Sequence, residues 1–377
     1  MDIRLTEDQE LLRASVQRLL RNEYSFEQRR KILDSDEGCS KRTWKSFSEL
    51  GLLAAPFSEE LGGLGEGSVA NMVIMQEFGR HLVVEPYFET VVVSGGLIEE
   101  AASETQKSRW LTEIANGDAI LALASIERHS RYDMANVSTA ARRSGDGFVI
   151  DGVKTAVVAG GWADKFIVTA RTAGEVRSRE GVSMFVVDRS AAGLSLRSFR
   201  TLDGRRAAEV VLKEVKVPES ALLGREGSAL SALEACRDRA IAGLCAEAVG
   251  AMGELNAATL DYAKMRKQFG VSIGTFQVLQ HRMVDMFIAH EEALSITQAL
   301  TLALSLNRTD VPKLAAAAKV KISAASKMVG EQAVQIHGGM GMTDELNVGH
   351  YFKRICAINS QFGDSTTHVM RFAGLAA

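Results

Sequence analysis

A long segment without proline, residues 228–268, constrains the fold of this chain more than any other feature. It reads SALSALEACRDRAIAGLCAEAVGAMGELNAATLDYAKMRKQ and keeps apolar residues at helical spacing. Because no proline interrupts it, the segment predicts one very long helix. Two more long helical segments follow at 276–306 and 311–339. Alanine-rich helices of similar length favour an antiparallel bundle, so the C-terminal part of the chain is predicted to be helical.

The spacing of apolar residues changes twice along the chain, near residues 121 and 222. Residues 1–120 have helical spacing, with Thr6 as the expected N-cap of the first helix. Residues 121–222 contain short β-rich runs separated by polar turns, including Gly145-Asp146-Gly147 between two runs. We therefore predict an N-terminal helical domain (1–120), a middle antiparallel β domain (121–222) and a C-terminal helical domain (223–377). This layout alone implies no function.

Composition excludes several classes of function. The net charge is −3 and no run of like charge occurs, which argues against nucleic acid or an anionic membrane as a partner. No apolar run approaches the roughly 20 residues of a membrane span, and the start of the chain lacks the apolar core of a secretory signal. Four cysteines are scattered without metal-ligand spacing. We expect a cytoplasmic protein with reduced thiols and no metal site.

Two C-terminal motifs carry more information. They are YAKMRKQFGVSIGTFQVLQHRMVDM (262–286) and QIHGGMGMTDELNVGHYFKRI (335–355). Together with the helix–β–helix order, they resemble the acyl-CoA dehydrogenase family, which oxidises acyl-CoA thioesters to 2-enoyl-CoAs with FAD. The resemblance extends over essentially the whole chain. It implies the acyl-CoA dehydrogenase fold, in which the last domain is a four-helix-bundle type, and an electron-transfer flavoprotein or equivalent as electron acceptor.

The residues themselves suit a nucleotide. Arg266 ends a long helix and carries a fork of donors for a diphosphate, and Phe269-Gly270 make a turn beside it. Gly338 and Gly339 free the backbone near a helix end. Alone, Arg266 also fits a surface ion pair, and the glycine pair also fits a helix C-cap. The resemblance implies that the ADP half of FAD is held here, and the full set of implied cofactor residues is Arg266, Phe269, Gln277, Gln335, Ile336, Gly338, Gly339, Ser365, Glu127 and Ala156.

Flavin-ring positions depart from the family pattern. Where the family reads like Thr-Glu-Pro-x-x-Gly-Ser-Asp, this chain has IERHSRYD (126–133), which keeps the glutamate as Glu127 but has Ile126 in place of threonine. Where the family reads like Lys-x-Trp-Ile-Thr-Asn, this chain has KTAVVAG, with Ala156 in place of tryptophan. A hydroxyl donor and a large stacking surface are therefore both missing.

The catalytic base also departs from the pattern. Most family members place a glutamate nine residues after the arginine matching Arg354, where this chain has Gly363 followed by Asp364. A minority supply the base from the long helix, at the position of Ala240. Asp364 is our first candidate base, and its alternative is an N-cap of the last helix. Glu247, two helical turns beyond Ala240, is the second, and its alternative is a carboxylate satisfied within the bundle.

Three hypotheses follow. The chain is an acyl-CoA dehydrogenase acting alone as a homo-oligomer, or a non-catalytic or half-catalytic subunit of an α2β2 heterotetramer that supplies the ADP clamp. In the third, it is a relative that uses flavin for oxygen chemistry and needs no base. The motifs ERHSRYD and FGDSTTH most resemble the small-subunit branch of the family, which includes small subunits of pimeloyl-CoA dehydrogenase and relatives of steroid side-chain dehydrogenases.

Overall fold

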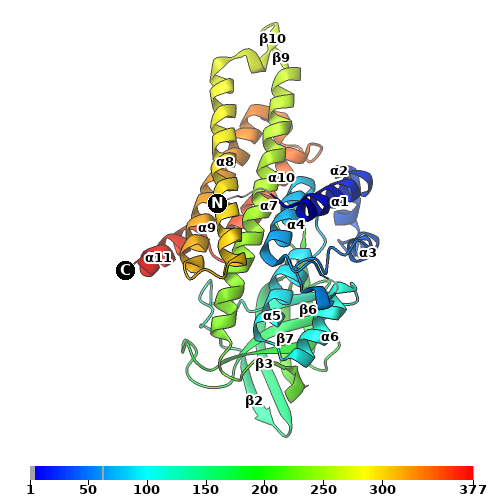
Figure 1. Cartoon of the computed structure of the whole chain (residues 1–377), viewed down its shortest axis with the longest axis vertical. Helices are drawn as coiled ribbons and strands as arrows, with labels where there is room; N and C mark the ends of the chain where they lie inside the picture. Colours follow the sequence, from blue (N-terminus) through cyan, green and yellow to red (C-terminus); the bar gives the residue numbers. More distant parts are fainter. Residues whose placement is uncertain (1–4, 62, 377) are drawn as a thin grey trace. The chain divides into compact units, whose positions relative to one another are not determined.

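The computed structural model describes residues 5–61 and 63–376 (Figure 1). Contacts divide the chain into two compact units. Unit 1 comprises residues 1–31, 68–83 and 241–377, and unit 2 comprises residues 32–67 and 84–240. The long helix α7, Leu230–Met265, starts in unit 2 and continues into unit 1. Among the described residues, we find no helix that is both long and apolar enough to span a membrane.

Unit 1 is helical. Its α8 and α9 pack along each other, and α9 also packs against α10 and α11 (Figure 1). The first helix begins at Thr6, whose hydroxyl accepts from Gln9 N while the Gln9 side chain accepts from Thr6 N, which confirms the expected cap. Besides α7, which has most of its residues in this unit, its α-helices are α1 (Glu7–Glu23), α2 (Phe26–Asp34), α4 (Gly67–His81), α8 (Gln277–Ser305), α9 (Val311–His337), α10 (Asn347–Ser360) and α11 (Ser365–Ala376).

A short hairpin joins the two longest helices of unit 1. Strands β9 (Lys267–Gln268) and β10 (Val271–Ser272) pair antiparallel between α7 and α8 (Figure 1). The two turn residues, Phe269 and Gly270, have φ values of +53° and +84°. Positive φ at both central positions is typical of the tight turns that match the twist of a hairpin.

Unit 2 contains a mixed sheet in the order β6-β7-β3-β2-β4-β5-β8, with β1 paired to β4. Its core includes Phe148 and Phe185, whose rings lie 4.9 Å apart. The strands are β1 (Leu121–Ala124), β2 (Ala140–Ser144), β3 (Gly147–Val158), β4 (Lys165–Arg171), β5 (Val182–Asp188), β6 (Leu194–Arg200), β7 (Arg206–Pro218) and β8 (Leu222–Leu223). The helices are α3 (Lys41–Glu49), the π-helix Phe88–Gly95, α5 (Gly96–Ala101) and α6 (Glu104–Ala115).

The predicted hairpin around Gly145-Asp146-Gly147 is confirmed, since β2 and β3 pair antiparallel from Ala140–Asp151 to Ser144–Gly147. The expectation of a purely antiparallel sheet is wrong at two pairings. β1 pairs parallel with β4 along its full length, and β2 meets β4 in parallel at Ala140 and Arg171. The β2–β3 hairpin lies between β1 and β4 in sequence, so the chain crosses over before β4 returns in the same direction.

Candidate cofactor and active site

The hairpin end of unit 1 presents an exposed cation and an exposed ring. Phe269 at the turn is 92% exposed, and its ring meets the ring of Phe276 edge to face, with the ring centroids 6.3 Å apart. Arg266 and Gln277 are also exposed. Within the described residues, the Arg266 guanidinium makes no hydrogen bond or ion pair. A phenylalanine held outside any core, beside an unpaired arginine, is typical of a binding surface.

The end of α9 lies against the same part of α7. His337, the last residue of α9, stacks on Tyr262 with ring centroids 4.4 Å apart, and Tyr262 is one helical turn before Arg266. The His337 Nδ1 atom bonds to the Ala333 carbonyl, 2.8 Å away. Burial lowers the pKa of His337 below its ordinary value. His337 therefore packs as a largely neutral ring. It links the Arg266 motif to the Gly338-Gly339 motif, the two segments predicted to hold the ADP half of the cofactor.

After His337, the chain continues through two glycines, Gly338 and Gly339, with free space beside their Cα atoms. Gly338 has φ +60°, and a Cβ added at Gly338 or Gly339 would meet no atom within 4 Å. Gln335 on the preceding turn is exposed, whereas Ile336 is buried. The space above the glycines, with the unpaired Arg266 guanidinium, fits the phosphates and ribose of a dinucleotide. These residues therefore have the chemistry that the ADP half of FAD would need.

In unit 2, Glu127 binds internal donors. Its carboxylate accepts from Lys154 Nζ at 2.6 Å, from Ser138 N at 2.8 Å and from Thr139 N at 3.0 Å. Burial alone would raise the pKa of Glu127, but Lys154 and the backbone donors together lower it. Burial lowers the pKa of Lys154 to about 8. The pair anchors the loop after β1 rather than presenting a carboxylate to a ligand.

Ala156 lies at an irregularity of β3. Its φ is +50°, and the register with β7 shifts between Lys154 and Val157. A bulge of this kind re-aims the side chains around it. Ala156 and Ile126 are both exposed, so this face offers a methyl group and a branched alkyl chain where the family pattern has a ring and a hydroxyl.

The position of the usual base is closed to any side chain. Gly363 has φ +111°, and a Cβ there would lie 2.4 Å from Nε2 of His368. His368 is fully buried, and the same Nε2 bonds to the Phe362 carbonyl at 2.9 Å. The glycine therefore accommodates the histidine ring. A glutamate at this position would require both a strained backbone and a displaced His368.

The two candidate carboxylates occupy different environments. Asp364 is exposed, and its Oδ1 accepts from Thr367 N at 2.8 Å at the start of α11. Asp364 therefore caps α11, which is the alternative role we gave it from the sequence, and Ser365 is the first residue of that helix. Glu247 lies inside unit 1 and forms a two-bond pair with Arg354, with distances of 2.7 and 2.6 Å. Both side chains are at most 2% exposed, so the alternative of a carboxylate satisfied within the bundle describes Glu247.

Lys319 is a buried cation that the sequence reasoning missed. It lies on α9, is fully buried, and donates to the carbonyls of Ile358 and Gln361, the latter at 2.8 Å. These carbonyls end α10, so Lys319 fixes the segment that leads to Gly363 and Asp364. The available signal was a lysine within AAAAKVKISAA, on the apolar face of a predicted helix.

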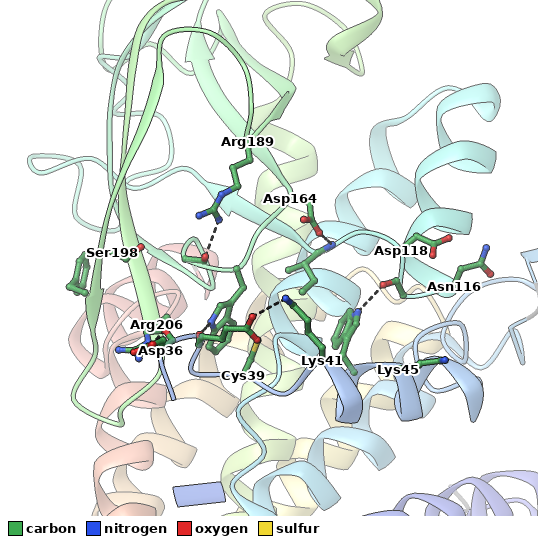
Figure 2. A pocket seen from close by; sticks show the side chains of 17 residues that line it. Asp36, Cys39, Lys41, Lys45, Asn116, Asp118, Asp164, Arg189, Ser198 and Arg206 are labelled. Atoms are coloured by element: carbon green, nitrogen blue, oxygen red, sulfur yellow. Dashed lines mark hydrogen bonds and ion pairs between the residues drawn. The ribbon is translucent and has the colours of Figure 1, made fainter. Parts of the chain in front are cut away.

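A separate cavity of about 850 Å³ opens in unit 2 (Figure 2). None of the predicted site residues lines it. Two of its charged side chains are engaged locally: Lys41 binds Glu37 at 2.8 Å, and Arg206 donates to the Ser35 carbonyl at 2.8 Å. Burial raises the pKa of its Cys39 thiol to about 12, which makes that thiol a poor nucleophile. The cavity and the predicted cofactor residues are thus different places.

Comparison with known proteins gives matches along the chain. Family models for the N-terminal, middle and C-terminal domains of acyl-CoA dehydrogenases match residues 6–118, 122–215 and 233–373. A short-chain specific acyl-CoA dehydrogenase of Clostridium acetobutylicum is 31% identical over 356 residues, which cover 92% of both chains. A variant of the Tcur3481-Tcur3483 steroid ACAD superposes with a TM-score of 0.88 at 26% identity, over 98% of both chains. Butyryl-CoA dehydrogenase of Megasphaera elsdenii has the same fold, with a TM-score of 0.92 at 23% identity over the full length of both.

Proposed function

The chain belongs to the acyl-CoA dehydrogenase family of FAD-dependent oxidoreductases, and we propose that it binds FAD through Arg266 and the open backbone at Gly338-Gly339. The family reaction is the α,β-dehydrogenation of an acyl-CoA thioester. The observation that carries the proposed site is the stack of His337 on Tyr262. It brings two motifs that are far apart in sequence to one end of unit 1.

In this proposal, different residues of the chain bind different parts of the cofactor. Arg266 holds the diphosphate by charge-assisted hydrogen bonds, and Gly338 and Gly339 let backbone groups approach the ligand. Phe269 and Gln277 cover the nucleotide from the hairpin and the start of α8. When bound, FAD supplies the hydride acceptor for the acyl chain.

We assign the proton acceptor to Asp364 rather than Glu247. Moving Glu247 toward a substrate would leave Arg354 buried without its partner, which costs about 3–5 kcal/mol. Asp364 is exposed at the start of α11, where its carboxylate accepts from Thr367 N, and it is not held in a buried ion pair of the kind that holds Glu247. Asparagine caps a helix as well as aspartate does, so Asp364→Asn removes the base and keeps the cap.

The test uses the purified chain. We expect stoichiometric FAD that bleaches when acyl-CoA substrates are added without oxygen, and loss of bleaching with retained flavin in Asp364→Asn. An Asp364→Ala enzyme that remains active would remove Asp364 from the mechanism. Rapid oxygen consumption by the reduced protein would instead favour the flavin–oxygen reaction.

A second candidate function is a partner subunit. Two observations favour this function. The usual base position, Gly363, has no room for a glutamate side chain, and Arg266 and Phe269 of the proposed clamp face solvent in the single chain, where a second chain could meet them. In this case the chain supplies the ADP clamp to an FAD whose ring and base belong to another acyl-CoA dehydrogenase chain. A colourless protein that becomes yellow only with such a chain would support this function over the first.

We also propose that unit 1 associates with another subunit along α7 and α8. A hollow of about 660 Å³ between these helices is lined by Leu260, Met283, Val284 and Phe287 among others. Leu260, Val284 and Phe287 are 44–58% exposed. Clustered exposed apolar side chains mark association surfaces. Charged substitutions at Val284 and Phe287 should therefore lower the molecular mass of the assembly measured in solution.

For the electron acceptor, we propose an electron-transfer flavoprotein.

A further inference from the structure

The segment that carries the two glycines of the proposed clamp lies against the start of α10. This glycine segment, Gly338–Met342, is a 3-10 helix that packs on α10. Thr343 closes it, because its N and Oγ1 atoms donate to the Met340 carbonyl at 3.2 and 2.9 Å. A Cβ added at Gly349, in the first turn of α10, would lie 3.3 Å from the Gly341 carbonyl oxygen. The first turn of α10 therefore sets where the glycine segment lies.

His350, at the end of this first turn, contacts groups on both sides of its ring. Its Nε2 atom lies 3.2 Å from the carbonyl oxygen of Asp344, in the loop between the glycine segment and α10. Its Nδ1 atom lies 3.2 Å from Nη1 of Arg29 on α2, and Arg29 Nε donates to the Leu82 carbonyl at 2.8 Å. The ring of Phe26 meets the imidazole edge to face, with the ring centroids 5.0 Å apart. His350 thus connects α2 to the loop that follows the glycine segment.

The two hydrogen bonds of His350 require a neutral imidazole. A guanidinium only donates, and a carbonyl oxygen only accepts. Nδ1 of His350 therefore accepts from Arg29, and Nε2 carries the proton and donates to the Asp344 carbonyl. A protonated ring has no acceptor to offer. Protonation would thus remove the bond from Arg29 and leave two positive charges side by side.

The charged groups around His350 act in both directions. Burial lowers the pKa of His350 below its ordinary value, and the positive charges of Arg29 and Lys353 act in the same direction. The carbonyl bond to Asp344 and the Asp344 carboxylate, whose Oδ1 is 3.8 Å from Nε2, act against them. That carboxylate is shared, because it accepts from Lys353 at 3.0 Å and is also attracted by Arg30. The ring is therefore neutral at neutral pH.

We propose that His350 is a positioning residue for the cofactor, which in its neutral form holds the loop after the glycine segment in the conformation that receives the nucleotide. This proposal rests on the proposed function, which places the ADP half of FAD at Gly338 and Gly339. His350 acts through Asp344 and the first turn of α10 rather than by touching the cofactor. A segment that is already held in place loses less conformational entropy when the ligand binds, so the contact raises affinity.

The experiment measures FAD binding to the flavin-depleted protein by fluorescence titration from about pH 5 to pH 8. In the wild type, we expect an affinity that is constant above about pH 6.5 and falls as His350 becomes protonated at lower pH. His350→Gln keeps one donor and one acceptor but cannot be protonated, so it should bind FAD as the wild type does at pH 8 and lose less affinity in acid. His350→Phe keeps a ring against Phe26 and loses both hydrogen bonds, so it should bind FAD about tenfold more weakly at pH 8.

Two comparisons isolate the effect of His350. His337, which also titrates near the glycines, is present in every variant, so the difference between wild type and His350→Gln reports on His350. His290→Gln is the matched control on α8, where the Nδ1 atom of His290 lies 3.1 Å from Glu291 and far along the chain from the glycine segment, and it should leave the affinity and its pH dependence unchanged.

The outcomes separate a positioning role from a structural one. The inference is overturned if His350→Phe binds FAD within twofold of wild type at pH 8, whether or not its melting temperature falls. It is also overturned if wild type and His350→Gln have the same pH dependence, and this comparison decides the matter if His350→Phe does not fold. A wild-type chain that binds no FAD at any pH, alone or with a partner chain, would instead overturn the proposed function.

Discussion

At the scale of single residues, a buried ion pair joins two distant parts of unit 1. Glu247 and Arg354 are 107 positions apart, and together they make two short hydrogen bonds out of contact with solvent. Such a pair contributes less than its geometry suggests, because both ions were desolvated to form it. Removing one partner is costly, since the other is left charged and buried.

We therefore expect Glu247→Gln to lower the free energy of unfolding by about 3–5 kcal/mol, measured by urea denaturation. The matched control is Glu234→Gln, which breaks the exposed pair with Arg179 and should cost no more than about 1 kcal/mol. Equal effects of the two substitutions would contradict the assignment of Glu247 to a buried pair.

The glycine at the usual base position gives a second prediction at this scale. Gly363→Ala adds a Cβ beside His368 at a positive φ, so it should cost at least about 2 kcal/mol of unfolding free energy. Gly145→Ala also has a positive φ but open space around it, so it should cost only about 1 kcal/mol. Thermal unfolding of both variants checks the difference. A stable Gly363→Glu protein would show that His368 yields the space after all.

At the scale of elements, a buried lysine joins α9 to the end of α10. Burial lowers the pKa of Lys319 to about 8 from 10.5. Between these values the unfolded chain binds more protons than the folded one, so the stability contributed by this group rises with pH. The neutral amine keeps two donors, enough for the two carbonyls it contacts.

The stability difference between wild type and Lys319→Met should therefore increase from about pH 8 to pH 10. Urea denaturation across this range measures it, with Lys321→Met, two residues along and partly exposed, as the control. A difference that is flat with pH would mean that Lys319 does not titrate early in the folded state.

The β9–β10 hairpin gives a prediction for binding rather than stability. Phe269 is 92% exposed, so Phe269→Ala should leave the melting temperature of the isolated subunit nearly unchanged. We expect it to weaken FAD by several-fold, since an aromatic face is lost from the proposed site. Fluorescence titration of the flavin-depleted protein measures this. A large drop in melting temperature with unchanged FAD affinity would assign Phe269 to folding instead.

At the scale of the whole molecule, much of the architecture was predictable because it follows local rules. The long helix was expected at 228–268 and extends over Leu230–Met265. The Thr6 cap and the hairpin at Gly145-Asp146 also follow from short sequence patterns. The parallel pairing of β1 with β4 did not, because strand direction depends on how the intervening hairpin is routed.

The sequence by itself determined the period and length of the elements, the glycine turns and the family to which the chain belongs. Each of these depends on residues that are near neighbours along the chain. Only the tertiary structure decided that Glu247 pairs with Arg354, that His368 fills the space at Gly363, and that His337 lies on Tyr262. These partners are distant in sequence or lie across a turn, and they meet only because packed helix faces select which side chains share an interior.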